Sequence, residues 1–404
     1  MNKLLVDGIY ATNIVKLKDI AEKKTTKNID GLVTETFTNS AENGIISQSD
    51  FFDRTITNDK NISGYYIVEP DDFVYNPRIS TFAPVGPINR NKLGRSGVMS
   101  PLYLVFHTHD VEPEYLEWYF KSNAWHQFMR DNGNTGARSD RFSISDAEFF
   151  NMPIPIPPVK VQKAIAKTLT TLDTKVTLEK NEVEKFQNLK SAMLTKMFPK
   201  KGENVPEIRF PGFTDAWEQR KVSETGNIIT GSTPKTSISD NYGGEFLFVS
   251  PADIQGNRYV DETITTLTKR GFDQGRKIRE GASLFVSIGS TIGKVAQTSQ
   301  ESTTNQQINA VESYDNFDDD FIFTLLENIS GSIKFIASNQ AVPIVNKTTF
   351  GETEIQVPSE LAEQQKIGAY FRNLDHLITL HQRKYEKLID TKKAFLEKLI
   401  GGEK

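Results

Sequence analysis

The sequence predicts an α+β fold: two mixed α/β domains in a pseudo-two-fold tandem repeat, joined by two long antiparallel coiled-coil helices. Three observations favour this fold. A heptad pattern of apolar residues occurs twice at an offset of 202 residues, a proline signal precedes each copy, and strand-like runs precede each proline signal. The 404 residues therefore divide into two halves of similar plan.

The helical segments 159–198 and 361–400 each carry a ten-position seam in which eight positions are apolar. A seam of this spacing is buried only against another helix, so we expect the two helices to pack together over about 60 Å. The alternative is two unrelated amphipathic helices on separate cores. The first seam is Ile165, Leu169, Leu172, Val176, Glu179, Val183, Phe186, Lys190, Met193 and Met197; the second is Ile367, Phe371, Leu374, Ile378, His381, Tyr385, Leu388, Lys392, Phe395 and Leu399.

Prolines and glycines indicate the boundaries of the expected segments. Pro157-Pro158 and Pro358 suit a first helical turn, and the alternate prolines from Pro153 enforce an extended chain before the first helix. A stretch rich in Pro, Gly and charge follows that helix and is a linker candidate. We expect domains at 1–156 and 213–356, helices at 157–198 and 357–404, and a linker at 199–212.

Both domains contain strand-like runs of β-branched and aromatic residues, at 65–68, 73–75 and 102–106 and again at 246–249, 283–288 and 308–311. One amphipathic helix is expected in each half, at 114–130 and 321–338. The aromatic face of the first of these helices, which includes Tyr115 and Trp118, is expected in the domain core rather than stacked on bases.

Composition excludes several classes of function. Cysteine is absent, which excludes disulfides, thiolate metal sites and cysteine nucleophiles. No stretch approaches 18 apolar residues and the first residues do not resemble a signal peptide, so we expect a soluble cytoplasmic protein without a membrane partner. The net charge is −4, and segments 1–158 and 213–360 carry −4 and −8 by count. Binding to nucleic acid would therefore need local basic patches.

No motif supports a catalytic site. The run from Gly289 to Lys294 resembles a phosphate-binding loop, but three residues separate its glycines instead of four, and Val295 follows the lysine. His107 and His109 could begin a metal site, but no further ligand cluster completes it. We therefore expect a chain that is not an enzyme and that binds no cofactor itself.

Local basic patches are the features that point to a binding function. Segments 73–109 and 281–300 contain no Asp or Glu, and 269–279 contains one acid among five Lys and Arg residues, at corresponding places in the two halves. Arg, Lys, Asn and Gln in loops bind phosphates and base edges, although ordinary solvated surface remains the alternative. The DNA-binding candidates are Arg78, Arg90, Lys92, Arg95, Arg138, Arg141, Thr233, Lys235, Lys269, Arg270, Arg276, Lys277, Lys294, Asn305 and Gln306.

An ordered set of motifs across nearly the whole chain resembles the specificity (S, HsdS-type) subunits of type I restriction–modification systems. In the second half the set comprises 210–222 (FPGFTDAWEQRKV), 231–234 (GSTP) and 289–293 (GSTIG). In the first half it comprises 73–78 (FVYNPR) and 97–101 (GVMSP), while 25–35 lack a Gly-x-Thr-Pro element. Each long helix adds Pro followed by Gln, at Pro157-Pro158 with Gln162 and, with one extra residue, at Pro358 with Gln364.

The resemblance implies that each domain is a target recognition domain reading one half of an asymmetric bipartite site in double-stranded DNA. It also implies that the helices set the unread spacer and dock two methyltransferase (M) subunits. S-adenosylmethionine, ATP and Mg would then belong to the partner M and restriction (R) subunits. Two competing classes are a coiled-coil adaptor that joins two protein-binding domains without binding DNA, and a self-sufficient DNA enzyme.

Overall fold

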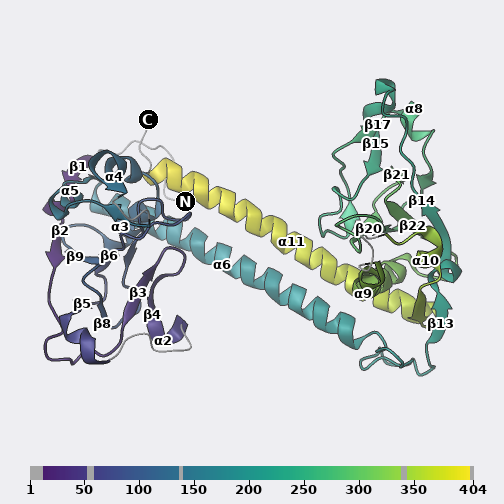
Figure 1. Cartoon of the computed structure of the whole chain (residues 1–404), viewed down its shortest axis with the longest axis horizontal. Coiled ribbons are helices and arrows are strands. Elements are labelled where there is room, and N and C mark those ends of the chain that lie inside the picture. Colours follow the sequence, from purple (N-terminus) through teal and green to yellow (C-terminus); the bar gives the residue numbers. More distant parts are fainter. Residues whose placement is uncertain (1–11, 52–58, 136–139, 338–343, 401–404) are drawn as a thin grey trace. The chain divides into compact units, whose positions relative to one another are not determined.

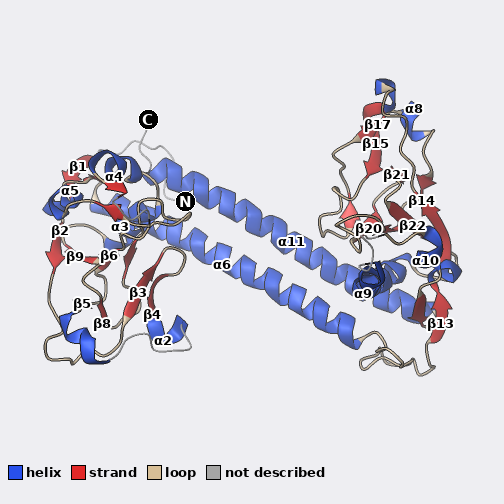
Figure 2. Ribbon diagram, in the orientation of Figure 1, coloured by secondary structure: helices blue, strands red, loops and turns tan. Residues whose placement is uncertain are grey.

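The computed structural model describes residues 12–51, 59–135, 140–337 and 344–400. The chain divides into two compact units. Unit 1 comprises Met1–Thr177 with Glu386–Lys404, and unit 2 comprises Leu178–Tyr385. Each unit combines strands, short helices and a segment of both long helices (Figures 1 and 2), so the expected α+β class is confirmed.

Unit 1 is built around the antiparallel sheet β2-β9-β6-β7 (Figure 1). Its strands are β1 (Asn13–Lys16), β2 (Ala21–Lys24), β3 (Phe37–Ser40), β4 (Gly44–Ser47), β5 (Tyr66–Val68), β6 (Phe73–Tyr75), β7 (Ile88–Arg90), β8 (Gly97–Met99), β9 (Leu104–Thr108), β10 (Asn134–Thr135), β11 (Phe142–Ser143) and β12 (Pro153–Ile156). Its helices are α2 (Gln48–Phe51), α3 (Pro113–Lys121), α4 (His126–Asn132), α5 (Asp146–Phe150), the first part of α6 (Val159–Lys196) and the last part of α11 (Leu361–Ile400), with 3-10 turns η1 (Leu17–Asp19) and η2 (Asp59–Gly64).

Unit 2 contains the sheet β14-β22-β19-β20-β16 and a second sheet, β17-β15-β21-β18. Its strands are β13 (Glu218–Lys221), β14 (Gly226–Thr230), β15 (Tyr242–Val249), β16 (Tyr259–Val260), β17 (Thr266–Leu267), β18 (Lys277–Ile278), β19 (Ser283–Val286), β20 (Val295–Thr298), β21 (Ser302–Thr304), β22 (Ile308–Ser313) and β23 (Glu354–Val357). Besides segments of α6 and α11, its helices are α7 (Val222–Thr225), α8 (Lys269–Phe272), α9 (Asp319–Ala337) and α10 (Lys347–Gly351), with the 3-10 turn η3 (Ser239–Asn241).

The tandem repeat extends into the domains. The order β2-β9-β6-β7 in unit 1 is matched by β14-β22-β19-β20 in unit 2 when the four strands of each sheet are ranked by their order along the chain, since both then read 1-4-2-3. In both units the last of these strands along the chain leads into a helix, α3 or α9, and an antiparallel pair, β1–β12 or β13–β23, leads into a long helix. The domains therefore share a topology although their sequences differ.

Both long helices begin with the same side-chain arrangement. In unit 1, Gln162 accepts a hydrogen bond from the amide of Glu112 at 2.9 Å and donates one to the carbonyl of Pro157 at 2.8 Å. In unit 2, Gln364 accepts from the amide of Asp318 at 3.1 Å and donates to the carbonyl of Pro358 at 3.0 Å. The extra residue before Gln364 is absorbed without loss of either bond.

The predicted seam is buried or half-buried along both helices. None of the twenty seam positions is classed as exposed, whereas most helix positions between them are. Apolar seam residues near the helix ends join the domain cores: Ile165 and Leu169 belong to the unit 1 core, and Phe371 belongs to the unit 2 core. The two helices therefore pack on each other, and each end is also anchored in a domain.

The polar seam residues form ion pairs that follow the 202-residue repeat. In unit 1, Lys392 contacts Asp173 at 2.5 Å, and in unit 2 the equivalent Lys190 contacts the equivalent Asp375 at 2.6 Å. The remaining two polar seam residues contact each other: His381 Nδ1 lies 2.7 Å from Glu179 Oε2. As the residue numbers increase along α6, the numbers of their partners on α11 decrease, so the helices are antiparallel within each unit.

The aromatic face of the expected helix at 114–130 lies in the core, as predicted. Tyr115 and Tyr119 are buried and donate hydrogen bonds to the carbonyls of Pro155 and Pro153 in β12, at 2.7 and 3.1 Å. This segment forms two helices, α3 and α4, so the prediction of one continuous helix was wrong. The hydroxyl of Ser122 donates to the carbonyl of Tyr119 at 2.6 Å, which replaces the next helical hydrogen bond and ends α3.

Several strand boundaries differ from the prediction: β5 starts one residue later than expected, β15 starts at Tyr242 and β22 ends at Ser313. The strand expected at 102–106 is β9, which starts at Leu104 because Pro101 and the Ser100 hydroxyl form a turn before it. The strand expected at 283–288 ends at Val286. The helix expected at 321–338 is α9, and Ser338 lies outside the described residues.

The segment expected as a linker, 199–212, packs against other parts of unit 2. Arg209 forms two hydrogen bonds to the buried Glu363 carboxylate of α11, at 2.7 and 2.8 Å. Further along, Trp217 is buried with its ring centroid 5.7 Å from Phe198 and 5.9 Å from Phe321. The motif at 210–222 thus fastens the start of the second domain to the end of α6.

Candidate nucleic-acid interface

Polar loops gather at one edge of the repeated sheet in each unit. The strands are antiparallel, so the end of β6, the end of β2 and the start of β9 meet at one edge in unit 1. The end of β19, the end of β14 and the start of β22 meet at the equivalent edge in unit 2. We call these the unit 1 edge and the unit 2 edge.

The unit 2 edge joins three loop segments. The amide of Ser232 donates to the carbonyl of Thr304 at 2.9 Å, and the hydroxyl of Thr233 donates to Oε1 of Gln306 at 2.6 Å. The amide of Ser287 donates to the carbonyl of Gln307 at 2.7 Å. The segments 231–234, 287–289 and 305–307 therefore form one surface, on which Thr233 and Gln306 are exposed.

Two glycines are required at the unit 2 edge. A Cβ atom on Gly231 would lie 2.2 Å from the carbonyl oxygen of Asn305, so any larger residue would separate the two loops. Gly289 has a φ of 98°, in the region that glycine alone adopts readily. The run 289–293 thus forms a tight turn after β19, in agreement with the rejection of a phosphate-binding loop.

The predicted cations of unit 2 lie in different settings. Lys235 and Arg276 are exposed, and Arg276 donates from Nη1 to the carbonyl of Thr230 at 2.7 Å, beside the 231–234 loop. Lys294 donates to the carbonyl of Ile254 at 2.8 Å and is half-buried. Asn305 is also half-buried and donates to Oε1 of Gln307 at 3.0 Å.

The cluster at 269–279 lies outside the repeated sheet, on α8 and β18 of the second sheet. Lys269 and Lys277 both contact Asp273, at 2.6 and 3.0 Å, and Arg270 lies 3.7 Å from Asp240. The expectation that this cluster matches segment 73–109 was wrong, because the strands equivalent to 73–108 are those at 283–313. Charge composition alone does not reveal which strands are equivalent.

The unit 1 edge contains a small pocket between loops. It is lined by residues that follow β6 and precede β9, together with α2 and the segment before β11. Its polar lining includes Gln48, Asn76, Arg78, Tyr103 and Arg141. Among the candidates of the first half, Arg78 and Arg141 are thus brought together although 63 positions separate them in the chain.

Most other cations of the acid-free segment are neutralised by carboxylates from elsewhere in unit 1. Arg90 contacts Glu117 at 2.7 Å, Lys92 contacts the same carboxylate at 3.1 Å, and Arg95 contacts Glu35 at 2.7 Å. Arg90 is mostly buried, whereas Lys92 and Arg95 remain about half exposed. Arg138 lies outside the described residues.

Glu117 is the centre of this ion-pair group. Burial alone would raise the pKa of the Glu117 carboxyl, but Lys121, Arg90 and Lys92 surround it and lower the pKa to about 2. Such a group holds α3 against β7 rather than leaving its cations free for DNA. No sequence pattern reveals this pairing, because Glu117 is 27 positions from Arg90 and outside the acid-free segment.

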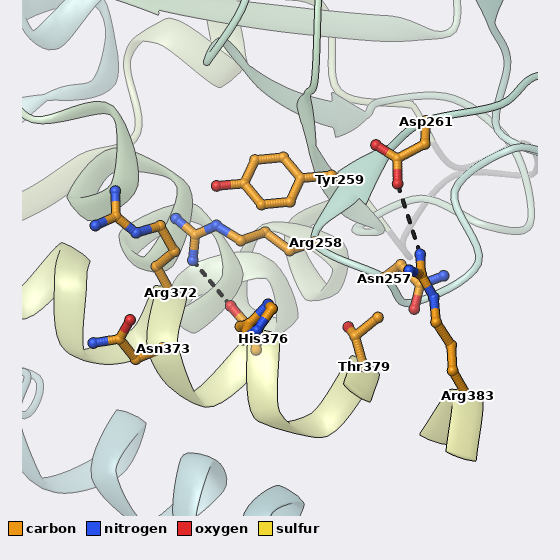
Figure 3. A pocket seen from close by; sticks show the side chains of 10 residues that line it. Asn257, Arg258, Tyr259, Asp261, Arg372, Asn373, His376, Thr379 and Arg383 are labelled. Carbon is orange, nitrogen blue, oxygen red and sulfur yellow. Dashed lines mark hydrogen bonds and ion pairs between the residues drawn. The ribbon is translucent and has the colours of Figure 1, made fainter. Parts of the chain in front are cut away.

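In a hollow beside α11 in unit 2, arginines are again bound to carboxylates of the same unit (Figure 3). It is lined by the segment around Arg258 and by Arg372, His376 and Arg383 of α11. Arg258 is buried and donates to Asp375 and Asp320 at 2.9 and 2.8 Å, and Arg372 donates to Asp320 at 2.6 Å. These guanidinium groups fasten the second domain to its helix, so the hollow is not a strong candidate for base reading.

The described residues contain no group of three or more His, Asp or Glu side chains placed to hold a metal ion. No described helix is both long and apolar enough to cross a membrane.

Comparisons with known proteins agree with the repeat. Residues 12–187 and 214–389 each match the family model described as the type I restriction modification DNA specificity domain. The chain is 28% identical over 195 residues to the HindI specificity subunit of Haemophilus influenzae, covering 46% of this chain and 41% of that subunit. It is 20% identical over 269 residues to the MjaVIII specificity subunit of Methanocaldococcus jannaschii, covering 63% of each. The alignments thus span less than two thirds of these relatives.

The fold also matches a solved structure over nearly its whole length. The crystal structure of a type I restriction–modification S subunit from M. genitalium aligns with a TM-score of 0.66 at 12% identity, covering 98% of this chain and 97% of that one. The matched family segments together cover most of the 404 residues. The chain belongs to the type I restriction modification DNA specificity domain family, and it carries two copies of the domain.

Proposed function

We propose that this chain is the DNA-reading specificity subunit of a type I restriction–modification complex. In this proposal, residues 1–156 and 213–356 are target recognition domains, each reading one half of a bipartite asymmetric site. The helices 157–198 and 357–404 set the unread spacer between the halves, and 199–212 is the connection. The chain itself catalyses no reaction.

The single observation that carries this proposal is the repeated sheet edge. Equivalent strands present polar loops at the same edge in both units, but the side chains differ. The unit 1 edge has two arginines with Gln48 and Asn76, and the unit 2 edge has Thr233 and Gln306 with Lys235 and Arg276. A shared scaffold with different contact groups suits two readers of different sequence. An adaptor for protein partners would not need amides and cations at matching loop positions.

The partners and cofactors follow from the same proposal. Two methyltransferase subunits dock on the helices and bring S-adenosylmethionine, and restriction subunits bring ATP and Mg. The acidic net charge of −4 is compatible with DNA binding if the methyltransferase subunits supply part of the phosphate contacts. We also propose that the complex acts in the cytoplasm.

The test is a combined variant at the unit 2 edge, Lys235→Ala with Arg276→Ala and Gln306→Ala, co-expressed with the methyltransferase subunits. All three side chains lie at the surface, so the complex should assemble normally while methylation of its target falls at least tenfold. Methylation mapping of genomic DNA and co-purification give the two readouts. Lys347→Ala, an exposed lysine on α10, is the control. Normal methylation by an assembled triple variant would favour the adaptor.

A further inference from the structure

We propose that the pocket at the unit 1 edge reads one G·C base pair, with Arg78 and Arg141 bonding to guanine and Gln48 accepting from cytosine. This inference rests on the proposed function, since it assigns the base pair that one half of the site must contain. It assigns base contacts to these two arginines and not to the other cations of unit 1.

The backbone places the two arginines side by side. Arg78 and Arg141 face each other in an isolated antiparallel bridge. The amide of Phe142 donates to the carbonyl of Pro77 at 2.8 Å, and the amide of Ile79 donates to the carbonyl of Asp140 at 3.0 Å. These two hydrogen bonds fix the bridge on both sides, so the two side chains start from adjacent positions and both line the pocket.

Among the described residues, no carboxylate competes for the two guanidinium groups. Within the described part of unit 1, neither Arg78 nor Arg141 forms an ion pair or a side-chain hydrogen bond, whereas Arg90 and Lys92 are bound to Glu117. Arg78 is exposed and Arg141 is half-buried. Their donors are therefore available to a ligand without breaking an existing contact.

One of the residues that line the pocket also carries an acceptor without a donor. Oε1 of Gln48 is buried and has no hydrogen-bond partner among the described residues, and Gln48 lines the same pocket. A buried amide oxygen without a partner is unfavourable in the free protein, so a ligand that supplies a donor removes that cost. The pocket thus offers two fork-shaped donors and one acceptor.

The loop that carries Arg78 is held in place before any ligand binds. Oδ1 of Asn76 accepts from the amide of Arg78 at 3.0 Å, and Nδ2 of Asn76 donates to the carbonyl of Asn39 at 2.9 Å. Asn39 is buried and donates in turn to the carbonyl of Val74 in β6 at 2.7 Å. Because this loop is already held in place, it loses little conformational entropy when a ligand binds.

The donor and acceptor pattern matches a G·C pair better than an A·T pair. In the major groove guanine presents two acceptors, O6 and N7, and the paired cytosine presents a donor, N4–H. Arg78 and Arg141 each donate to one of these two acceptors, and the Gln48 oxygen would accept from the cytosine donor. An A·T pair lacks the second purine acceptor, so one arginine contact would be lost.

The experiment uses the complete complex of this chain with its methyltransferase subunits. Genomic methylation mapping first gives the wild-type target, and then the targets of Arg78→Ala, Arg141→Ala and Gln48→Ala complexes. Arg130→Ala, an exposed arginine on α4 that does not line the pocket, is the matched control. The arginine variants should lose roughly 10- to 100-fold of the discrimination at one G·C pair, and Gln48→Ala should relax the same pair.

All three variants should leave the sequence specificity for the other half of the target unchanged. Arg78→Lys should restore only part of the discrimination, because lysine keeps the charge but its flexible ammonium group is not held in the plane that the guanidinium donors occupy. Three results would overturn the assignment: a half-site without a G·C pair, relaxation at an A·T pair, or a uniform loss of binding with a shallower salt dependence, which would indicate phosphate contacts. A wild-type complex that methylates no specific sequence would refute the proposed function instead.

Discussion

At the scale of single residues, the charges of this chain are largely used inside the domains. Glu117 neutralises Arg90, Lys92 and Lys121, and Asp320 with Asp375 neutralises Arg258. Removing a buried carboxylate that is surrounded by cations is costly, because the mostly buried Arg90 then loses its buried partner and keeps the exposed Asp71. The cations still available for a ligand are therefore fewer than the sequence suggests.

Glu117→Gln should destabilise unit 1 at neutral pH by about 3 kcal/mol, the usual cost of breaking a buried ion pair from one side. The pKa of Glu117 is lowered to about 2 in the folded protein, whereas an unfolded glutamate titrates near 4.3. The stabilisation is thus fully present above about pH 4.3 and disappears as the pH falls toward 2.

Urea denaturation followed by tryptophan fluorescence at several pH values would measure this difference, because Trp118 and Trp125 are buried in unit 1. The gap between the wild-type protein and Glu117→Gln should narrow as the solution is acidified. Glu148→Gln, at an exposed position on α5, is the control and should leave the urea midpoint unchanged. A gap that stays constant from pH 7 to pH 3 would contradict the assigned pKa.

At the scale of elements, the long helices depend on a buried glutamine at the start of each. Gln162 and Gln364 are each 1% exposed, and each joins the helix start to a backbone amide of its own domain. Replacing either by Ala should cost about 2–3 kcal/mol, because one amide and one carbonyl lose their partners. The matched control is Gln365→Ala, an exposed neighbour that should change stability by less than about 0.5 kcal/mol.

Thermal unfolding gives the size of this effect, and hydrogen exchange gives its location. Faster exchange should be confined to the domain segments that each glutamine bonds, around Glu112 or Asp318, and to the first turn of the helix. Equal destabilisation by Gln364→Ala and Gln365→Ala would show that the hydrogen bonds are not the cause.

The sequence predicted the long helices well and the sheet repeat not at all. Apolar spacing runs without a gap through α11, and Pro358 marks its start, so Leu361–Ile400 could be predicted to the residue. The equivalence of β6 with β19 is invisible in sequence, because FVY and SLFV share only a preference for strands. Topology depends on long-range pairing that local patterns do not encode.

The candidate site shows the same limit. Charge composition identified Arg78 and Arg90 equally, and only the fold shows that Glu117 is paired with one and not the other. The pocket at the unit 1 edge joins α2, the residues after β6, the residues before β9 and the segment before β11. Gln48 carried no motif, and an unpaired buried oxygen is a property that appears only once side chains are packed.

At the scale of the whole molecule, the 202-residue repeat relates contacts as well as sequence. Lys190 with Asp375 and Lys392 with Asp173 are equivalent pairs, and Glu179 with His381 joins equivalent positions to each other. Polar pairs at defined seam positions specify which positions of two helices meet, since a shift would bury a charge against an apolar side chain. The register of the helices is therefore fixed at three places along the pair.

A fixed register is what a spacer of defined length needs, and this can be tested by lengthening both helices. Four residues inserted near Glu179 in α6, with four at the opposing point of α11 near His381, add about one turn or 6 Å to each helix while keeping their pairing. If the helices set the distance between the two readers, the unread spacer of the methylated site should grow by about one to two base pairs. Both half-sites should stay the same, because neither sheet edge is altered. Insertion in α6 alone, which breaks the register, is the control and should lower methylation without giving a new spacer. An active double insertion with the original spacer length would show that the helices do not measure this distance.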